Sequence, residues 1–167
     1  MGLIDGLLQE LEQEAQTTRR VLERVPNDRL TWRPHEKSRT LGELALHIAT
    51  VPGAVAKLVA AGSTAQVPEF TDPSPKSAGE LIPALDEGIA KAKKLLSGMD
   101  DATLMSTWRL MRGDREVFAL PRVAMLRSIM LNHWYHHRGQ LTVYLRELDV
   151  PIPSVYGPSA DENPFGS

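Results

Sequence analysis

Four stretches of the chain repeat their apolar residues at every third or fourth position, and this spacing constrains the fold more than any other feature. The first stretch covers residues 3–25 and ends at Pro26. The second covers residues 41–62 and follows a capping-box sequence, Thr40-Leu41-Gly42-Glu43. Because an α-helix has 3.6 residues per turn, each repeat predicts an amphipathic helix with one buried face.

Two further helices are predicted later in the chain. Ser77-Ala78-Gly79-Glu80 is a second capping-box sequence, and it precedes apolar residues spaced helically as far as Met99. The fourth helix is expected to begin at Pro121 and to run to about Leu148. The two long connections show no sustained period, although Gly113-Asp114 allows a short hairpin in the second connection.

Four long helices and few strand signals predict an all-α fold, a four-helix bundle. A length of 167 residues corresponds to one domain, with the bundle at residues 1–150. Residues 151–167 contain four of the 12 prolines, so we expect an irregular tail packed on the same domain. The long connections between helices two and three and between helices three and four leave room for crossovers.

Composition excludes several functional classes. Lys and Arg number 19 and Asp and Glu number 21, so the chain lacks the basic excess typical of nucleic-acid-binding proteins. The absence of cysteine excludes disulfides, cysteine-ligated metals and a protein thiol nucleophile. The sequence shows neither a secretory signal nor a membrane-spanning apolar run, so we expect no membrane association and a cytoplasmic location.

Histidines are the most informative residues for function. His133 and His137 lie about 40° apart on one helical face, within an apolar stripe. His47 also falls in an apolar stripe, on the second helix, whereas His136 points to the edge of its own stripe. Three inward imidazoles can hold a divalent metal and leave one coordination position open. The alternative is that they are core histidines that form hydrogen bonds within the protein.

Segments around these histidines resemble the DinB-like (DinB/YfiT) family of metal-dependent proteins. The resemblance is carried by residues 32–38, 40–47, 133–141 and 156–162, and the His-Arg-Gly-Gln run that begins at His137 is its most specific part. It implies a bundle with up-down-down-up order, which often forms a homodimer. It also implies that His47, His133 and His137 are the metal ligands.

The resemblance further implies a function. Some family members transfer a low-molecular-weight thiol, such as bacillithiol, mycothiol or glutathione, to an electrophile. We therefore expect a metal-dependent thiol transferase with small-molecule substrates, and imidazole ligands suit Zn, Ni or Fe. The alternatives are a metal-assisted hydrolase and a non-catalytic module that binds a metal or a stress ligand. No catalytic side chain is assigned, because the spacing places no Ser, Asp or Glu as a general base.

Residues near the histidines receive more modest predictions. We expect His35 to be exposed in its loop and His136 to flank the site without ligating the metal. Arg138 and Gln140 are candidates to bond neighbouring backbone or to orient a ligand imidazole. Gly139, which weakens a helix, is expected to allow close helix–helix approach.

Overall fold

The computed structural model describes residues 2–69 and 71–166. Helices carry most of these residues, and the last long one is a compound helix made of α5, η3 and α6. The long elements are α1 (Leu3–Leu22), α2 (Leu41–Ala60), α3 (Leu81–Leu96), α5 (Arg122–Met125), η3 (Leu126–Asn132) and α6 (His133–Glu147). The short helices are η1 (Asn27–Arg29), η2 (Ala78–Glu80) and α4 (Asp101–Met105).

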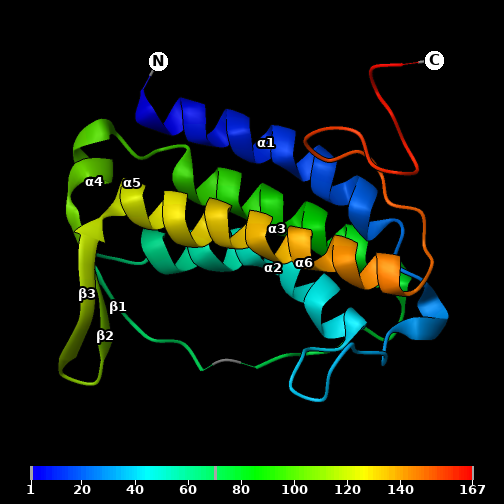
Figure 1. Ribbon diagram of the computed structural model, residues 1–167. Helices are drawn as coiled ribbons and strands as arrows, with labels where there is room; N and C mark the ends of the chain where they lie inside the picture. Colours follow the sequence, from blue (N-terminus) through cyan, green and yellow to red (C-terminus); the bar gives the residue numbers. More distant parts are fainter. Residues whose placement is uncertain (1, 70, 167) are drawn as a thin grey trace.

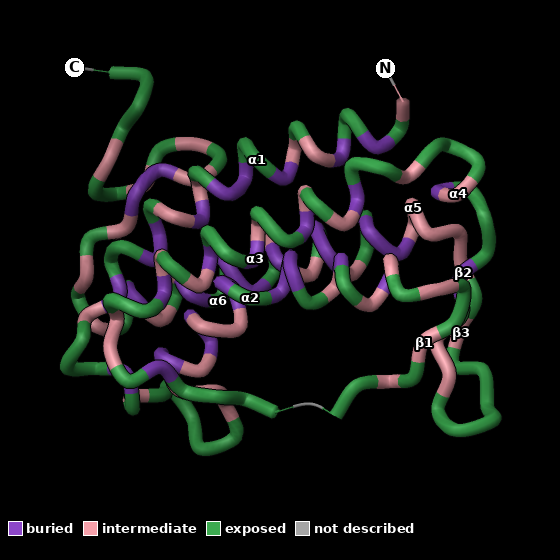
Figure 2. The backbone as a smooth tube through the Cα atoms, turned by 180° about the vertical axis from the view of Figure 1, so that it is seen from behind, coloured by how far each residue is buried: buried purple, intermediate pink, exposed green. Residues whose placement is uncertain are grey.

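The long helices lie side by side, and the two in the middle of the chain run opposite to the first and the last (Figure 1). α1 and the compound helix run one way, and α2 and α3 run the other way. Buried residues follow the sides of these helices that face one another (Figure 2), as the apolar stripes predict. This arrangement places the His-bearing segments of α2 and α6 against each other in the interior.

The prediction of an all-α fold is wrong in one respect, because the chain also forms a small sheet. β2 (Thr107–Arg112) and β3 (Arg115–Pro121) form an antiparallel hairpin, and β1 (Thr64–Gln66) pairs with β2 in parallel. The hairpin is where Gly113-Asp114 allowed one, and Gly113 adopts a φ of 59°, which glycine tolerates without strain. β1 has only three residues, too few for a period to be seen.

Of the two predicted capping boxes, only the one at Thr40 forms at the start of a helix. The Thr40 hydroxyl accepts the Glu43 N–H at 3.2 Å, and the Glu43 carboxylate accepts the Thr40 N–H at 2.7 Å. The capping box predicted at Ser77 is wrong, because the Ser77 side chain caps no N–H and a 3₁₀ turn, η2, precedes α3. The firm cap at Thr40 fixes the start of the helix that carries His47.

α2 and α3 pack closely where two glycines meet. A Cβ atom at Gly53 would lie 2.9 Å from the Cα and carbonyl oxygen of Gly88, so neither position has room for a side chain. The close approach predicted for Gly139 is wrong, since a Cβ atom there would meet open space. α2 also contains Pro52, and Figure 1 shows the helix changing direction along its length.

The fourth predicted helix is continuous but not uniform. Its middle segment, η3, has π-helical hydrogen bonding over Leu126–Asn132, directly before His133. Such segments widen the helix by about one residue per turn and are frequent at functional sites. The 100° periodicity used for the sequence therefore applies to α6 but does not extend across η3.

The described tail, residues 151–166, has no helix or strand and lies against α1 and α6. The Glu162 carboxylate accepts hydrogen bonds from Arg20 at 2.5 and 2.6 Å, and Asp161 pairs with Arg146. α2 is long and apolar enough to cross a membrane, with a mean hydropathy of 1.3 in its most apolar window. Half of that window is buried within the domain, as expected for a core helix.

Candidate metal centre

The three predicted ligands meet at one point between α2 and α6. The ring centroids of His133 and His137 lie 4.3 Å apart, because residues four apart share one face of α6. His47 reaches them from α2, with its centroid 4.7 Å from that of His137 and 5.5 Å from that of His133. One ligand nitrogen from each ring lies within 4.8 Å of the other two. We call these residues the His triad.

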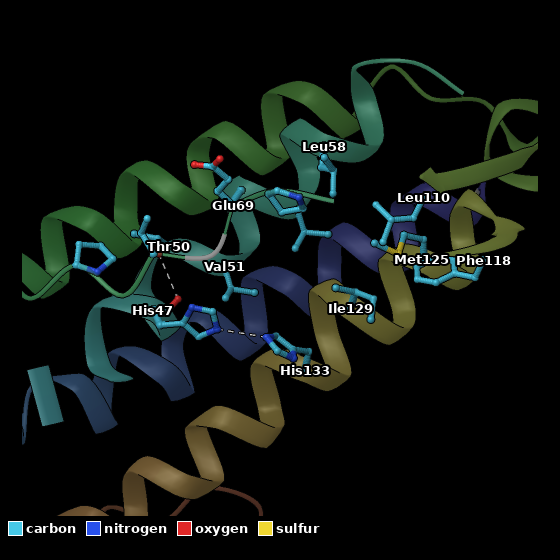
Figure 3. A pocket seen from close by; sticks show the side chains of 15 residues that line it. His47, Thr50, Val51, Leu58, Glu69, Leu110, Phe118, Met125, Ile129 and His133 are labelled. Carbon is cyan, nitrogen blue, oxygen red and sulfur yellow. Dashed lines mark hydrogen bonds between the residues drawn. The ribbon is translucent and has the colours of Figure 1, made fainter. Parts of the chain in front are cut away.

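Hydrogen bonding within the His triad is incomplete. The Nε2 atoms of His47 and His133 face each other at 3.2 Å, as Figure 3 shows. His137 Nδ1 lies 2.7 Å from the amide oxygen of Gln140, so Nδ1 carries the proton and donates it. His137 Nε2 is then an unprotonated nitrogen, and it is buried with no partner among the described residues. A buried polar atom without a partner is costly, and a metal ion would satisfy it.

Electrostatics keep these imidazoles neutral. Burial lowers the pKa of His47 to about 4, and the nearby Arg39 cation and the other two rings act in the same direction. Burial also lowers the pKa of His137 to about 4, although its hydrogen bond with Gln140 opposes the shift. The pKa of His133 is lowered too, first by burial and then by His136. Neutral imidazole is the form that ligates metals, so the His triad is ready to bind one at neutral pH.

Comparison with known proteins matches nearly the whole chain. The family model described as "DinB family" matches residues 4–164. The chain belongs to the DinB family. Uncharacterized protein YrdA of Bacillus subtilis is 27% identical over 160 residues, which cover 95% of this chain and 91% of YrdA.

Solved structures of DinB-like proteins share the fold. A DinB-like protein from Bacillus cereus superposes with a TM-score of 0.68 at 26% identity, over 91% of this chain and 97% of that one. The DinB-like protein YjoA from Bacillus subtilis gives a TM-score of 0.64 at 21% identity, over 86% of this chain and 92% of YjoA. The helices and their packing are therefore those of the DinB family.

Four further residues of this DinB-family chain received predictions from the sequence, namely His35, His136, Arg138 and Gln140. His136 is exposed beside His137, and His35 is exposed in its loop, where its Nδ1 accepts the Lys37 N–H. Gln140 orients His137, one of the two roles predicted for it. Arg138 takes the other predicted role, because its guanidinium donates to the Glu14 backbone carbonyl at 3.3 Å within a separate cluster and orients no imidazole of the His triad.

That cluster, which we call the Arg138 cluster, joins α1, α6 and the tail. Arg138 is 2% exposed, and its guanidinium lies 2.6 Å from the Glu14 carboxylate. It also donates to the Thr18 hydroxyl at 3.1 Å and to the Tyr156 hydroxyl at 2.5 Å. The Tyr156 hydroxyl in turn donates to Glu14 at 2.9 Å. The cluster holds the tail on the bundle without contributing to the His triad.

Sequence reasoning missed two features of the site. Arg39 precedes the cap of α2, pairs with Asp72 at 2.6 Å and supplies the positive charge felt by all three imidazoles. Its only signal in the sequence is its place, one residue before the capping box of the helix that carries His47. The second feature is a cavity of about 540 Å³, which His47 and His133 line at one end (Figure 3).

Proposed function

We propose that this DinB-family protein binds a divalent metal through His47, His133 and His137 and transfers a low-molecular-weight thiol to an electrophilic substrate. The observation that carries the proposal is the convergence of three neutral imidazoles at the end of a cavity large enough for a small molecule. The family resemblance supplies the reaction type. Zn, Ni and Fe all suit such a ligand set.

The chain's own residues prepare this chemistry. Gln140 holds the His137 ring so that its unprotonated Nε2 is free to ligate, and burial keeps all three rings neutral. A divalent ion held by the His triad would lower the pKa of a thiol bound to it. A substrate bound against the apolar side chains beyond the His triad would displace water, which otherwise competes with the thiol for the electrophile.

The transfer needs no oxidant or reductant, because no atom changes its oxidation state through an outside partner. The thiol of the cosubstrate gives its proton to solvent, and its sulfur forms a bond to the electrophilic carbon. The leaving group departs with the electron pair of the bond that breaks, or an epoxide oxygen takes up a proton when its ring opens. The chain contains no cysteine, so no protein thiol competes for the electrophile.

Metal analysis of single variants tests the ligand set. We expect His47→Ala, His133→Ala and His137→Ala each to lose stoichiometric metal after purification and dialysis. His136→Ala is the matched control, an exposed histidine on the same helix, and it should keep its metal. Full metal retention in His47→Ala would contradict a three-histidine site.

Visible spectra of the cobalt-substituted protein test the thiol. A thiolate charge-transfer band should appear when bacillithiol, mycothiol or glutathione is added, and the same thiol should support turnover with an electrophile. Ester cleavage without any thiol would instead assign metal-assisted hydrolysis. Metal binding without turnover for any of these pairs would assign a non-catalytic binding module.

We also propose that the protein forms a homodimer, as the family resemblance implies. We expect it to be located in the cytoplasm, where low-molecular-weight thiols are kept reduced. The near-balanced charge of 19 basic and 21 acidic residues favours small-molecule substrates over nucleic acid.

A further inference from the structure

We propose that the electrophile is an uncharged molecule with an extended apolar body, which lies in the cavity beside the His triad. We call this cavity the trough. For the reactive end of the substrate, the inference rests on the proposed function. For the body of the substrate, it rests on the residues that line the trough. It identifies the substrate by the chemistry of the surface that would hold it.

One wall of the trough is a stripe of α2. Val51, Ala54, Val55 and Leu58 line it, and their spacing of three and four residues places them on one helical face. Thr50 also lines the trough, but its hydroxyl donates to the Leu46 carbonyl at 2.9 Å within its own helix. This wall therefore presents mainly hydrocarbon, and the Thr50 hydroxyl can only accept a hydrogen bond from a ligand.

The opposite wall and the far end are also apolar. Met125 and Ile129 line the trough from α5 and η3, and Leu110 and Phe118 close its far end from the hairpin (Figure 3). Phe118 is backed by Trp108, whose ring is fully buried with its centroid 6.3 Å away. The small sheet thus forms the end of the trough that is most distant from the His triad.

The dimensions of the trough fit an elongated small molecule. His47 and Leu58 are eleven residues apart on α2, which corresponds to about 16 Å of helix. The volume of about 540 Å³ lies within the range of small-molecule sites and is too small for a folded partner. A molecule of this kind could place one reactive end at the His triad and its body along the walls.

The charges of the residues that line the trough limit the class of substrate further. Among the described residues that line the trough, Glu69 is the one ionisable group apart from His47 and His133, and Glu69 is exposed. No Lys or Arg is among these lining residues, so a phosphate or sulfate group would find no cation along the trough. Arg39, near the His triad, is already paired with Asp72. Apolar burial is therefore the dominant source of affinity for the body of the substrate.

A homologous series of alcohols tests the trough without needing any reaction. We would titrate 1-butanol, 1-hexanol and 1-octanol into the zinc-loaded protein by calorimetry. Burial of one methylene group is expected to tighten the Kd about two- to fourfold, until the chain fills the trough. A Kd that does not change with chain length would overturn the inference.

A variant in which a larger side chain fills the trough tests whether the alcohols bind there. Ala54 lies on the exposed rim of α2 and lines the trough, so Ala54→Trp should fold and occupy the space. We expect it to weaken 1-octanol binding at least tenfold. The matched control is Ala90→Trp, the same substitution at an exposed position of α3 that does not line the trough, and it should bind like the wild type. Unchanged 1-octanol binding in Ala54→Trp would contradict the trough as the binding site.

Kinetics with 1,2-epoxyalkanes of the same lengths separate this inference from the proposed function. If kcat/KM with an active thiol rises with chain length, the transferase function and the apolar substrate class are both supported. Turnover that is independent of chain length would remove the apolar substrate class and leave the transferase. Length-dependent alcohol binding without thiol transfer would keep the trough as an apolar ligand site and remove the transferase.

Discussion

Two buried polar clusters begin at adjacent residues of α6, and they differ in how completely their atoms are paired. His137 belongs to the His triad, and its buried Nε2 has no partner among the described residues. Arg138, the next residue, is buried even more completely, yet its guanidinium bonds to Glu14, Thr18 and Tyr156. Successive residues point about 100° apart on a helix, so each cluster faces a different part of the molecule.

The difference is the one expected between a structural cluster and the metal site that we propose. The Arg138 cluster is complete within the chain, and two aromatic rings flank its cation, with centroids 5.0 Å (Tyr156) and 5.2 Å (Tyr135) away. The His triad leaves His137 Nε2 unpaired among the described residues, and the proposed metal would pair it. A fully paired buried group resists removal, whereas an unpaired one favours a ligand.

The largest effect is expected from Arg138→Met. Removing the cation leaves Glu14 buried without its partner, and breaking a buried ion pair in this way costs about 3–5 kcal/mol of unfolding free energy. Urea denaturation measures the loss, and stoichiometric metal should be retained. Lys93→Met is the control, because its ion pair with Glu12 is exposed and should cost under about 1 kcal/mol. Equal losses in the two variants would remove the distinction.

Metal removal should have a comparable or somewhat smaller effect. An ion at a thousandfold excess over its Kd stabilises the folded state by about 4 kcal/mol, so chelation should lower the melting temperature by several degrees. Helical circular dichroism at room temperature should stay nearly unchanged, because the helices bury a full apolar core. Loss of helicity on chelation would make the metal a structural element and would favour the binding-module function.

The smallest effect is expected from His137→Leu in the metal-free protein. Removing a buried unpaired nitrogen should leave the unfolding free energy unchanged or raise it by about 1 kcal/mol. In the wild type, burial lowers the pKa of His137 to about 4 in the folded protein, below the value of about 6.5 for an unfolded histidine. The metal-free wild type should therefore lose stability as the pH falls through that window, and the variant should lose less.

Denaturation curves of both metal-free proteins at several pH values measure this difference. A variant that is at least 2 kcal/mol less stable than the wild type at neutral pH would show that His137 is a structural core residue. The His triad would then resemble the Arg138 cluster more than a ligand site.

Local patterns predicted much of the site, because its main parts depend on helical spacing. His133 and His137 share a face whatever the rest of the chain does, and the apolar stripe of α2 turns His47 inward. Gln140 lies three residues from His137, so its contact was also within reach of the sequence. The Thr40 capping box is local in the same way.

Other features depend on segments that are distant in the sequence. β1 pairs Thr64 with Arg109, and a three-residue strand carries no period that would reveal such a partner. The Arg138 cluster needs Glu14 and Tyr156 to meet, and no spacing within α6 indicates either. The trough is assembled from α2, a loop, the hairpin and the compound helix, so its lining could not be predicted from any one of them.

The Arg138 cluster also bears on how the chain folds. Glu14 and Tyr156, which both contact the Arg138 guanidinium, are 142 residues apart in the sequence. Until the tail docks, burying Arg138 against α1 would leave the guanidinium without the Tyr156 hydroxyl, one of its hydrogen-bond acceptors. We therefore expect the close packing of α6 on α1 to be completed late in folding, when these distant segments have come together.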